Sequence, residues 1–436
     1  MTNIKRRDFL KGTAALGAGL ALPALIPSSA WGDGAPSNKV GIGMISCGAR
    51  ANYAGMYPRH KRAQIVAVCD PIKSRRDKCS KKFNNAKAYD DFRELLANKD
   101  VDGVHIATPD HWHVPIALLA AKAGKDMYTE KPLGICINQD LKAREIVDKY
   151  KRVFQYGAQQ RSLIHVRLGI ELVLNGHIGE LKECFVWAPH GKAGGNPAEQ
   201  PVPADLDYDM WLGPAPKKPY CKDRVFGGGR WYCYDYAIGF IAGWGAHPMD
   251  MLQWYLDNAG LPEIPVKYEG TGRIPTQGLF DTVTNWDVQC TYANGLKMRF
   301  MDDVTARQKK PHSAVGGGRK SGHGTLFVGS EGWVEVNRGG WKTSTEEIRK
   351  KAKNPGKKRL KESRDQIHNF VDCMISRETP VDDLHSAVRS DVATHLAEIA
   401  VRTKKPVQWD PKKETIVGNA EGIKMMDRPM RTPWTV

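Results

Sequence analysis

From residue 39 to about residue 160, short apolar runs alternate with longer segments that have helical spacing. Wholly apolar strands separated by helices are typical of a parallel sheet that is covered on both faces. We therefore expect an α/β protein whose N-terminal domain is a doubly wound Rossmann sheet, at residues 31–157. The predicted strands are 40–45, 65–69, 104–107, 126–129 and 153–156, and the predicted helices include 72–83 and 114–123.

After Arg161 the pattern predicts a helix to Asn175 and then strands that are spaced more widely along the chain. The chain is long enough for more than one core. We assign residues 158–436 to a second α/β domain. Its predicted strands are 181–187, 283–292, 296–301 and 325–328, and an apolar helix is predicted at 246–256.

The first 30 residues do not fit this pattern. A basic segment with the pair Arg6 and Arg7 precedes a small, apolar run from Gly12 to Ile26, followed by Pro27 and small residues. This order is typical of a twin-arginine signal peptide, and a buried N-terminal helix is the less favoured alternative. We expect residues 1–30 to be removed and the protein to be exported, to the periplasm or an equivalent compartment.

The formal net charge of +17 is partly concentrated in a basic stretch at residues 346–364. Basic residues follow one another there from Arg349 to Arg364 without the interleaved aromatic residues that stack on nucleic-acid bases. We expect a solvated surface insertion and no nucleic-acid partner; attraction to an anionic envelope or glycan is a minor alternative. No internal apolar run is long enough to span a membrane.

Nine cysteines occur without a CxxC spacing, which argues against a zinc site or a dense disulfide framework. At most one disulfide is expected, between Cys221 and Cys233 in a loop region. His111 and His113 lie two residues apart without a third ligand nearby, so no metal site is predicted.

A dinucleotide fold requires small residues after its first strand, so that backbone N–H groups and a helix N-terminus can approach a pyrophosphate. Here Ser46, Cys47, Gly48 and Arg50 occupy that turn, with glycine at only one of the usual positions. Asp70, at the end of the second strand, is placed to bind the adenosine ribose, which favours NAD over NADP. The basic residues Lys73, Arg75 and Arg76 keep NADP as an alternative, and a nucleotide-free α/β domain is a further one.

Four further segments narrow the assignment: 107–113, which contains Thr108-Pro109-Asp110-His111-Trp112-His113; 128–132, which ends in Glu130-Lys131-Pro132; 157–161; and 243–250. With the turn at Gly48 they resemble the glucose-fructose oxidoreductase, inositol dehydrogenase and rhizopine catabolism (Gfo/Idh/MocA) family over nearly the whole mature chain. The subgroup most similar to this chain is exported and includes glycoside hydrolase family 109.

The resemblance implies a large, open, mostly antiparallel second sheet that covers the nicotinamide. It implies bound NAD(H), with Thr108, Pro109, His113 and Glu130 beside the cofactor, and a cis peptide at Pro132. Lys131 would hold and polarise a carbinol oxygen.

In this family an Asp usually lies four residues before the active-site His, but this chain has Gly243 before His247. The base must then be His247, Lys131 or Tyr236; a structural capping role for His247 is the alternative. Further predicted substrate contacts are Gln160, Arg161, Trp231 and His323, although the aromatic residues could equally be core.

Export of the protein restricts how a nicotinamide cofactor can be used. Free NAD is not replenished outside the cytoplasm, so we expect the cofactor to stay tightly bound and to be recycled. The expected activity is NAD(H)-dependent oxidation or reduction of a sugar or glycoside. The alternatives are redox-neutral hydrolysis or lysis of glycosides through transient C3 oxidation and elimination, and a non-catalytic sugar-binding relic. The family's open sheet also favours a homo-oligomer.

Overall fold

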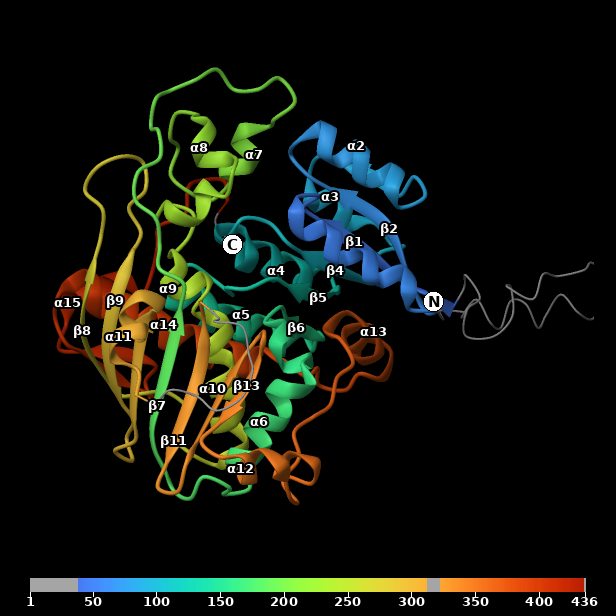
Figure 1. Cartoon of the computed structure of the whole chain (residues 1–436). Helices are drawn as coiled ribbons and strands as arrows, with labels where there is room; N and C mark the ends of the chain where they lie inside the picture. Colours follow the sequence, from blue (N-terminus) through green and yellow to red (C-terminus); the bar gives the residue numbers. More distant parts are fainter. Residues whose placement is uncertain (1–37, 312–321, 435–436) are drawn as a thin grey trace, which may run out of the picture. The chain divides into compact units, whose positions relative to one another are not determined.

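The computed structural model describes residues 38–311 and 322–434, so the predicted signal peptide lies outside the described residues. Two β-sheets organise this part of the chain (Figure 1). The first has six strands in the order β3-β2-β1-β4-β5-β6, and all of its pairs are parallel. This is the doubly wound arrangement that the alternating pattern predicts. Its strands are β1 (Val40–Ile45), β2 (Ala63–Cys69), β3 (Lys87–Tyr89), β4 (Gly103–Ile106), β5 (Asp126–Thr129) and β6 (Phe154–Tyr156).

The second sheet has nine strands in the order β13-β12-β11-β7-β10-β9-β8-β14-β15. The pair β7·β10 is parallel and the other pairs are antiparallel. This confirms the expected mostly antiparallel sheet, and the one parallel pair makes it a mixed sheet. The strands are β7 (Leu181–Ala188), β8 (Lys267–Arg273), β9 (Asn285–Thr291), β10 (Lys297–Asp302), β11 (Gly324–Gly329), β12 (Trp333–Asn337), β13 (Gly340–Thr343), β14 (Val407–Asp410) and β15 (Thr415–Val417).

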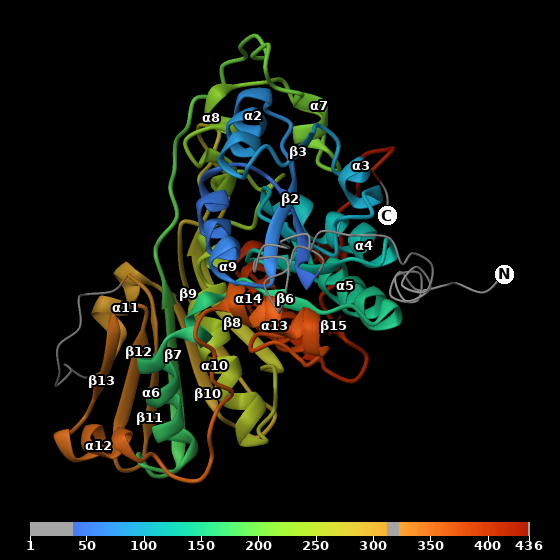
Figure 2. The ribbon, with the colours of Figure 1, turned by 90° about the vertical axis from the view of Figure 1, so that its right-hand side faces the viewer.

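Buried helices connect the two sheets. Helix α14 (Leu384–Thr403) packs on β8 and β9 of the second sheet and on β6 of the first. Its start is capped by Asp383, whose carboxylate accepts the backbone N–H groups of His385 and Ser386. Helices α6 (Ile164–Leu174) and α10 (Ala246–Ala259) lie against the second sheet (Figure 2). The α-helices between the strands of the first sheet are α2 (Lys73–Lys82), α3 (Phe92–Ala97), α4 (His113–Lys122) and α5 (Ile137–Tyr150), and the others are α7 (Tyr208–Leu212), α8 (Lys222–Val225), α9 (Phe240–Gly243), α11 (Asp303–Lys309), α12 (Glu346–Lys350), α13 (Gln366–Ser376) and α15 (Ala420–Met425).

Most predicted elements agree with the structure to within about two residues, but the first crossover differs. The segment after β1 forms a 3-10 helix, η4 (Ala49–Arg59), in place of an α-helix. Pro58 lies inside it, and its apolar and polar side chains do not separate onto two faces. Because proline lacks the N–H that a longer α-helix would need, a regular crossover helix is disfavoured there.

All nine cysteines lie in the described part of the chain, and all are free. Cys221 and Cys233 are both buried thiols, so the single disulfide considered from the sequence is absent from the structure. Cys233 belongs to an apolar cluster around the loops 206–236, and Cys221 is buried next to Tyr220 of that cluster, so both pack as small hydrophobic residues.

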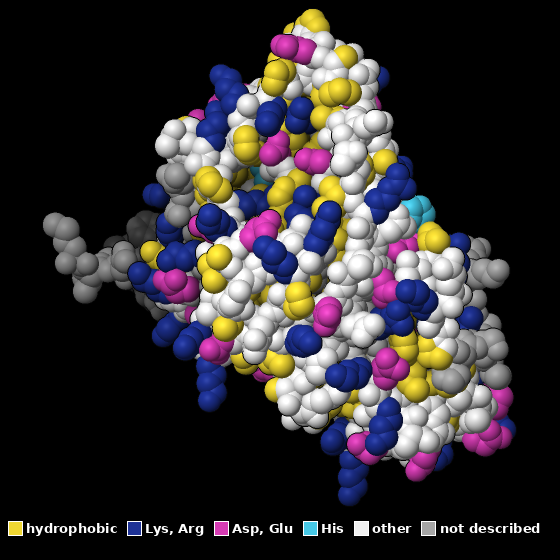
Figure 3. Space-filling view, turned by 90° about the vertical axis from the view of Figure 1, so that its left-hand side faces the viewer, with side chains coloured by type: hydrophobic (Ala, Val, Ile, Leu, Met, Phe, Trp, Pro, Cys, Tyr) yellow, Lys and Arg dark blue, Asp and Glu magenta, His cyan; other side chains and the backbone are white. Residues whose placement is uncertain are grey.

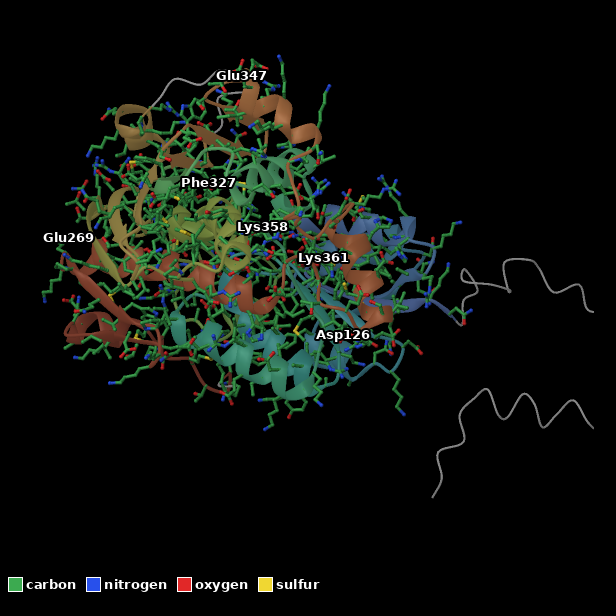
Figure 4. The ribbon with its side chains drawn as sticks, turned by 90° about the horizontal axis from the view of Figure 1, so that it is seen from below. Asp126, Glu269, Phe327, Glu347, Lys358 and Lys361 are labelled. Atoms are coloured by element: carbon green, nitrogen blue, oxygen red, sulfur yellow. The ribbon has the colours of Figure 1, made fainter. Side chains whose placement is uncertain are left out.

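The basic stretch 346–364 lies at the surface but is anchored. Ile348 and Leu360 are buried, and the amide group of Asn175 exchanges hydrogen bonds with the backbone of Lys358. On the face drawn in Figure 3, basic and acidic side chains are interspersed. Three charged residues of this stretch can be located in Figure 4, which labels Glu347, Lys358 and Lys361. Within residues 38–311 and 322–434, no helix is long and apolar enough to cross a membrane.

Candidate active site

Two adjoining cavities open at the carboxyl ends of β1, β2, β4 and β5, where open α/β sheets bind their ligands. The larger has a volume of about 410 Å³ and the smaller about 180 Å³. They share the lining residues Arg50, Ala107, Thr108, Arg230 and Trp231, so they form one continuous cleft. We call them the cofactor cavity and the substrate cavity.

The turn after β1 is held by Asp70 at the end of β2. Its two carboxylate oxygens accept the backbone N–H groups of Cys47 at 2.7 Å and Ile72 at 2.8 Å. Burial raises the pKa of Asp70, although these two hydrogen bonds oppose the effect. Ser46 has a φ of 91°, a left-handed conformation that a glycine would adopt without strain. Asp70 therefore stabilises the turn in addition to lining the cofactor cavity.

The groups that line the cleft fit a dinucleotide. Thr108 Oγ1 and the Nε atoms of Arg50 and Arg230 are buried and have no hydrogen-bond partner among the described residues. Buried polar groups are normally paired, and all three can donate to phosphate or amide oxygens. Gly48, Arg75 and Pro109 line the cofactor cavity beside Asp70.

Of the three basic residues that kept NADP open, only Arg75 lines the cofactor cavity. Lys73 pairs with Asp77, and Arg76 donates to the backbone oxygen of Asp70. Arg75 lies over the ring of Phe226 at 5.4 Å. Arg75 is thus the residue through which a 2′-phosphate could be accommodated.

The loop after β5 places Glu130 and Lys131 in the cleft. Arg50 donates to the Glu130 carboxylate. The Lys131–Pro132 peptide is cis, as the resemblance implies. The ring of His113 joins the two loops, with Nδ1 2.6 Å from Pro132 O and Nε2 3.1 Å from Thr108 O. Gly157 packs against this loop and cannot carry a side chain, because a Cβ atom there would lie 2.9 Å from Glu130 Cα.

Lys131 lines the substrate cavity, and its ammonium group donates to the backbone oxygen of Gly243. Burial lowers the pKa of Lys131 to about 8, against the opposing charges of Asp110 and Glu130. The Nζ atom lies 5.4 Å from the centre of the Trp244 ring. An amine with this pKa can both release and take up a proton near neutral pH.

His247, at the start of α10, is buried and lines the same cavity. Its Nε2 lies 3.0 Å from Nη2 of Arg338, and its Nδ1 has no hydrogen-bond partner in the described part of the protein. Burial, followed by the charges of Lys131 and Arg338, lowers the pKa of His247 well below its usual value. The imidazole is therefore neutral at pH 7.

Asp110 is a carboxylate that the sequence pattern did not identify as a site residue. It is buried in the substrate cavity, and its Oδ2 lacks a partner among the described residues. A Cβ built on Gly243 would lie 3.9 Å from that oxygen. Asp110 thus brings a carboxylate close to the position where the sequence lacks the expected Asp. The only sequence signal was its place directly after β4, between Pro109 and His111.

The predicted residues do not all meet in this cavity. Lys131, His247 and Trp231 line it, and Trp231 is 38% exposed. Gln160 is buried behind it, where its amide nitrogen lies 3.0 Å from Nε2 of His323. The ring of His323 in turn packs on Trp244. In place of Gln160, Gln159 lines the cavity.

Tyr236 and Arg161 lie elsewhere. Tyr236 is fully buried beside Trp211, and its hydroxyl accepts a hydrogen bond from Arg224. Burial raises its pKa far above the usual value, so the structure does not bring it into the cleft as a base. Arg161 is 3% exposed and donates to Asp250. Its guanidinium is used in a buried ion pair, which leaves it no access to substrate.

His111 also points away from the substrate cavity. Its Nε2 lies 3.1 Å from the backbone oxygen of Trp211. In the described part of the chain, no group of three or more His, Cys, Asp or Glu side chains could hold a metal ion.

Comparison with known families agrees with both halves of this architecture. Residues 40–158 match the profile of the Gfo/Idh/MocA "Oxidoreductase family, NAD-binding Rossmann fold". Residues 168–436, more than half of the chain, match that of the "Oxidoreductase family, C-terminal alpha/beta domain". The chain belongs to the Gfo/Idh/MocA oxidoreductase family. Residues 3–23 match a twin-arginine translocation signal sequence, which indicates export of this family member by that route.

Several curated relatives match part of this Gfo/Idh/MocA chain. A glycosyl hydrolase family 109 protein 1 of Shewanella sp. (strain ANA-3) is 26% identical over 212 residues, which cover 42% of this chain and 45% of that protein. The D-glucoside 3-dehydrogenase of Escherichia coli (strain K12) is 30% identical over 145 residues, or 33% of this chain and 40% of that one. The chain thus aligns with less than half the length of these relatives.

Solved structures share the fold at low identity. The WlbA dehydrogenase from Bordetella pertussis, in complex with NADH and UDP-GlcNAcA, has a TM-score of 0.61 at 15% identity, covering 85% of this chain and 99% of that one. The aldose-aldose oxidoreductase from Caulobacter crescentus, complexed with glycerol, has a TM-score of 0.59 at 15% identity and the same coverage. At this identity the likeness concerns the Gfo/Idh/MocA fold alone.

Proposed function

We propose that this protein is an exported NAD(H)-dependent oxidoreductase that acts on a sugar or glycoside and keeps its cofactor bound between turnovers. The observation that carries the proposal is Lys131, a half-buried lysine in the loop after β5, whose pKa is lowered to about 8 inside a cavity that adjoins the larger cavity at the ends of β1 and β2. The names of the relatives, among them a D-glucoside 3-dehydrogenase, support a carbohydrate substrate.

The residues that would hold NAD are Gly48, Arg50, Asp70 and Thr108, with Arg230 across the cleft. When bound, the cofactor would supply a hydride acceptor (NAD) for oxidation of the carbinol carbon and a hydride donor (NADH) for reduction of a carbonyl. Glu130 orients Arg50 for the cofactor through their ion pair. Trp231 lines both cavities of the shared cleft.

Lys131 acts on the proton of the same hydroxyl. In its neutral form the amine accepts that proton as the carbinol is oxidised, and in its charged form it returns the proton on reduction. Asp110 stabilises the charged form, since its negative charge opposes the effect of burial on the lysine. The pair Lys131 and Asp110 thereby replaces the His and Asp pair that the family pattern suggested.

Retention of the cofactor follows from export. The twin-arginine signal sends folded proteins out of the cytoplasm, and outside it a released NADH would not be reoxidised. A cofactor held by buried donors on both sides of the cleft satisfies this requirement. Acid-quenched, as-purified protein should release about one nicotinamide nucleotide per chain, and protein without nucleotide would refute the retained-cofactor proposal.

A second candidate is redox-neutral glycoside cleavage, in which transient oxidation at C3 acidifies C2–H and permits elimination of the anomeric substituent. Two observations favour it: relatives named as glycosyl hydrolase family 109 proteins, and a second potential base, His247, in the same cavity as Lys131. Addition of water and reduction of the ketone would then give the free sugar and leave the cofactor in its starting oxidation state.

One experiment separates the two candidates. The as-purified protein is incubated without added NAD with aryl glycosides and with 3-keto glycosides, while aryl release and reduced-nicotinamide absorbance are both followed. Sustained aryl release indicates the redox-neutral route, and a single stoichiometric absorbance change indicates an oxidoreductase that awaits a second substrate. If neither occurs with any sugar, the protein is a binding relic and the catalytic proposal is wrong.

A further inference from the structure

Arg338 is an arginine that lines the substrate cavity and forms no ion pair with an acidic side chain of the described residues. It lies in the turn between β12 and β13 and contacts His247 and Trp244, with its Cζ 5.3 Å from the centre of the Trp244 ring. No carboxylate of the described residues lies within ion-pair distance of it. By contrast, Arg50 and Arg161 each have a carboxylate partner.

The hydrogen bond from Arg338 uses the lone pair with which the neutral imidazole of His247 could accept a proton. A guanidinium has only donors, so His247 Nε2 must accept and the ring proton must lie on Nδ1. That Nδ1 is buried without a partner in the described part of the chain. While Arg338 stays in place, His247 has no free lone pair with which to accept a proton from a substrate.

The substrate cavity is lined by more cationic than anionic side chains. Its cations are Arg50, Lys131, Arg230 and Arg338, and its anions are Asp110 and Glu130. Glu130 is already paired with Arg50. Arg50 and Arg230 also line the cofactor cavity, where they can meet a pyrophosphate, whereas Arg338 lines only the substrate cavity. The positive charge of Arg338 thus remains for the substrate.

The turn that carries Arg338 allows its side chain to move. Arg338 is exposed, but the preceding Asn337 is buried and accepts the backbone N–H of Gly339 at 2.8 Å. The backbone is therefore anchored beside the cavity while the long side chain is free to change partners.

We propose that Arg338 binds an anionic oxygen substituent of the sugar, a carboxylate or a sulfate ester, and in doing so leaves His247 so that Nε2 becomes available as a base. This inference rests on the proposed function, because it names the substrate class of the same site. The planar guanidinium matches such groups with two parallel hydrogen bonds, which the single contact to imidazole does not use. Neutral sugars would leave Arg338 on His247, so the charged substituent would both bind and activate.

The first test is binding, measured by calorimetry on the as-purified protein. The ligands are methyl β-glucuronide, glucose 6-sulfate and methyl β-glucoside, with the wild type, Arg338→Leu and, as a matched control, Arg364→Leu in the exposed basic stretch. We expect the wild type and Arg364→Leu to prefer at least one anionic sugar by tenfold or more, and Arg338→Leu to lose this preference. The comparison of uronate with sulfate identifies the anion.

A wild type without preference for either anion, including one that binds none of the three sugars, would overturn the proposal, as would a preference that survives in Arg338→Leu. Turnover gives a second readout: Arg338→Leu should raise KM at least tenfold for the anionic glycoside. For the neutral glycoside it should raise kcat of aryl release severalfold, since His247, the second potential base of the redox-neutral route, is no longer blocked. An unchanged or lower kcat for the neutral glycoside would contradict the release of His247. The nucleotide content of the same samples tests the proposed function separately, because binding selectivity can fail in a protein that carries and reduces NAD.

Discussion

The pKa of Lys131 leads to a prediction that tests the proposed chemistry directly. Burial lowers this pKa from 10.5 to about 8. At pH 7 the neutral fraction of the amine then rises from about 0.03% to about 9%, a gain that corresponds to roughly 3 kcal/mol. If neutral Lys131 accepts the hydroxyl proton, the rate of sugar oxidation should rise about tenfold per pH unit below pH 8 and level off above it.

The assay is single-turnover reduction of NAD between pH 6 and 10, with saturating NAD and sugar. Lys131→Met should lose about 10²–10⁴-fold in rate. Lys131→Arg is the informative control, because arginine keeps the charge and the donors but does not release its proton in this pH range. We expect it to be as impaired as Lys131→Met and to lose the inflection. A flat profile in the wild type, or Lys131→Arg within threefold of wild-type rate, would refute the role of Lys131 as the proton acceptor.

Three further predictions concern residues around the cleft. Asp110→Asn removes a charge that favours the ammonium form of Lys131, so the inflection of the same profile should move to lower pH; an unmoved inflection would mean that Asp110 carries no charge there. Arg161→Met leaves the buried carboxylates of Asp250 and Asp382 without their cation. It should lower the unfolding free energy measured in urea by about 3–5 kcal/mol, while KM of the folded protein stays near the wild-type value. A rise in KM without loss of stability would show that Arg161 contacts the substrate. Ser46→Gly relieves the left-handed conformation at φ 91°. Strain of this kind costs about 1–3 kcal/mol and the freedom of glycine in the unfolded chain about 0.4–1 kcal/mol, so the protein should gain about 1 kcal/mol of stability with unchanged nucleotide content; a loss of more than about 1 kcal/mol would show that the serine is not strained.

The alternation of short apolar strands and helices was enough to predict five of the six strands of the first sheet, because strands buried on both faces have a strong local signal. The short edge strand β3 was not predicted. The Glu130-Lys131-Pro132 segment and the turn at Gly48 likewise identified the family, since each combines a strand end with residues that the chemistry needs. The pattern of apolar and polar residues after Arg161 was less informative about the second sheet. Its sheet joins strands from residue 181 to residue 417, and the order of such distant strands depends on contacts that no local pattern contains.

The sequence by itself determined which residue types could act, and the tertiary structure decided which of them meet. Lys131 and His247 were identifiable from their motifs, but only the packing of α10 and the loop after β5 shows that both line one cavity. Tyr236 and Arg161 had equally suitable chemistry, yet each is buried against a partner far away in sequence or on a neighbouring loop.

Arg338 and Asp110 had little sequence signal, because a charge in a hairpin turn and a carboxylate after a strand are common. Asp110 becomes a candidate site residue because it is buried and its Oδ2 has no partner among the described residues. Arg338 becomes one because it contacts the ring of His247. These properties arise only when segments far apart in the sequence enclose the same space. The local pattern therefore predicts the elements and the candidate chemistry, whereas the long-range packing selects the residues that form the site.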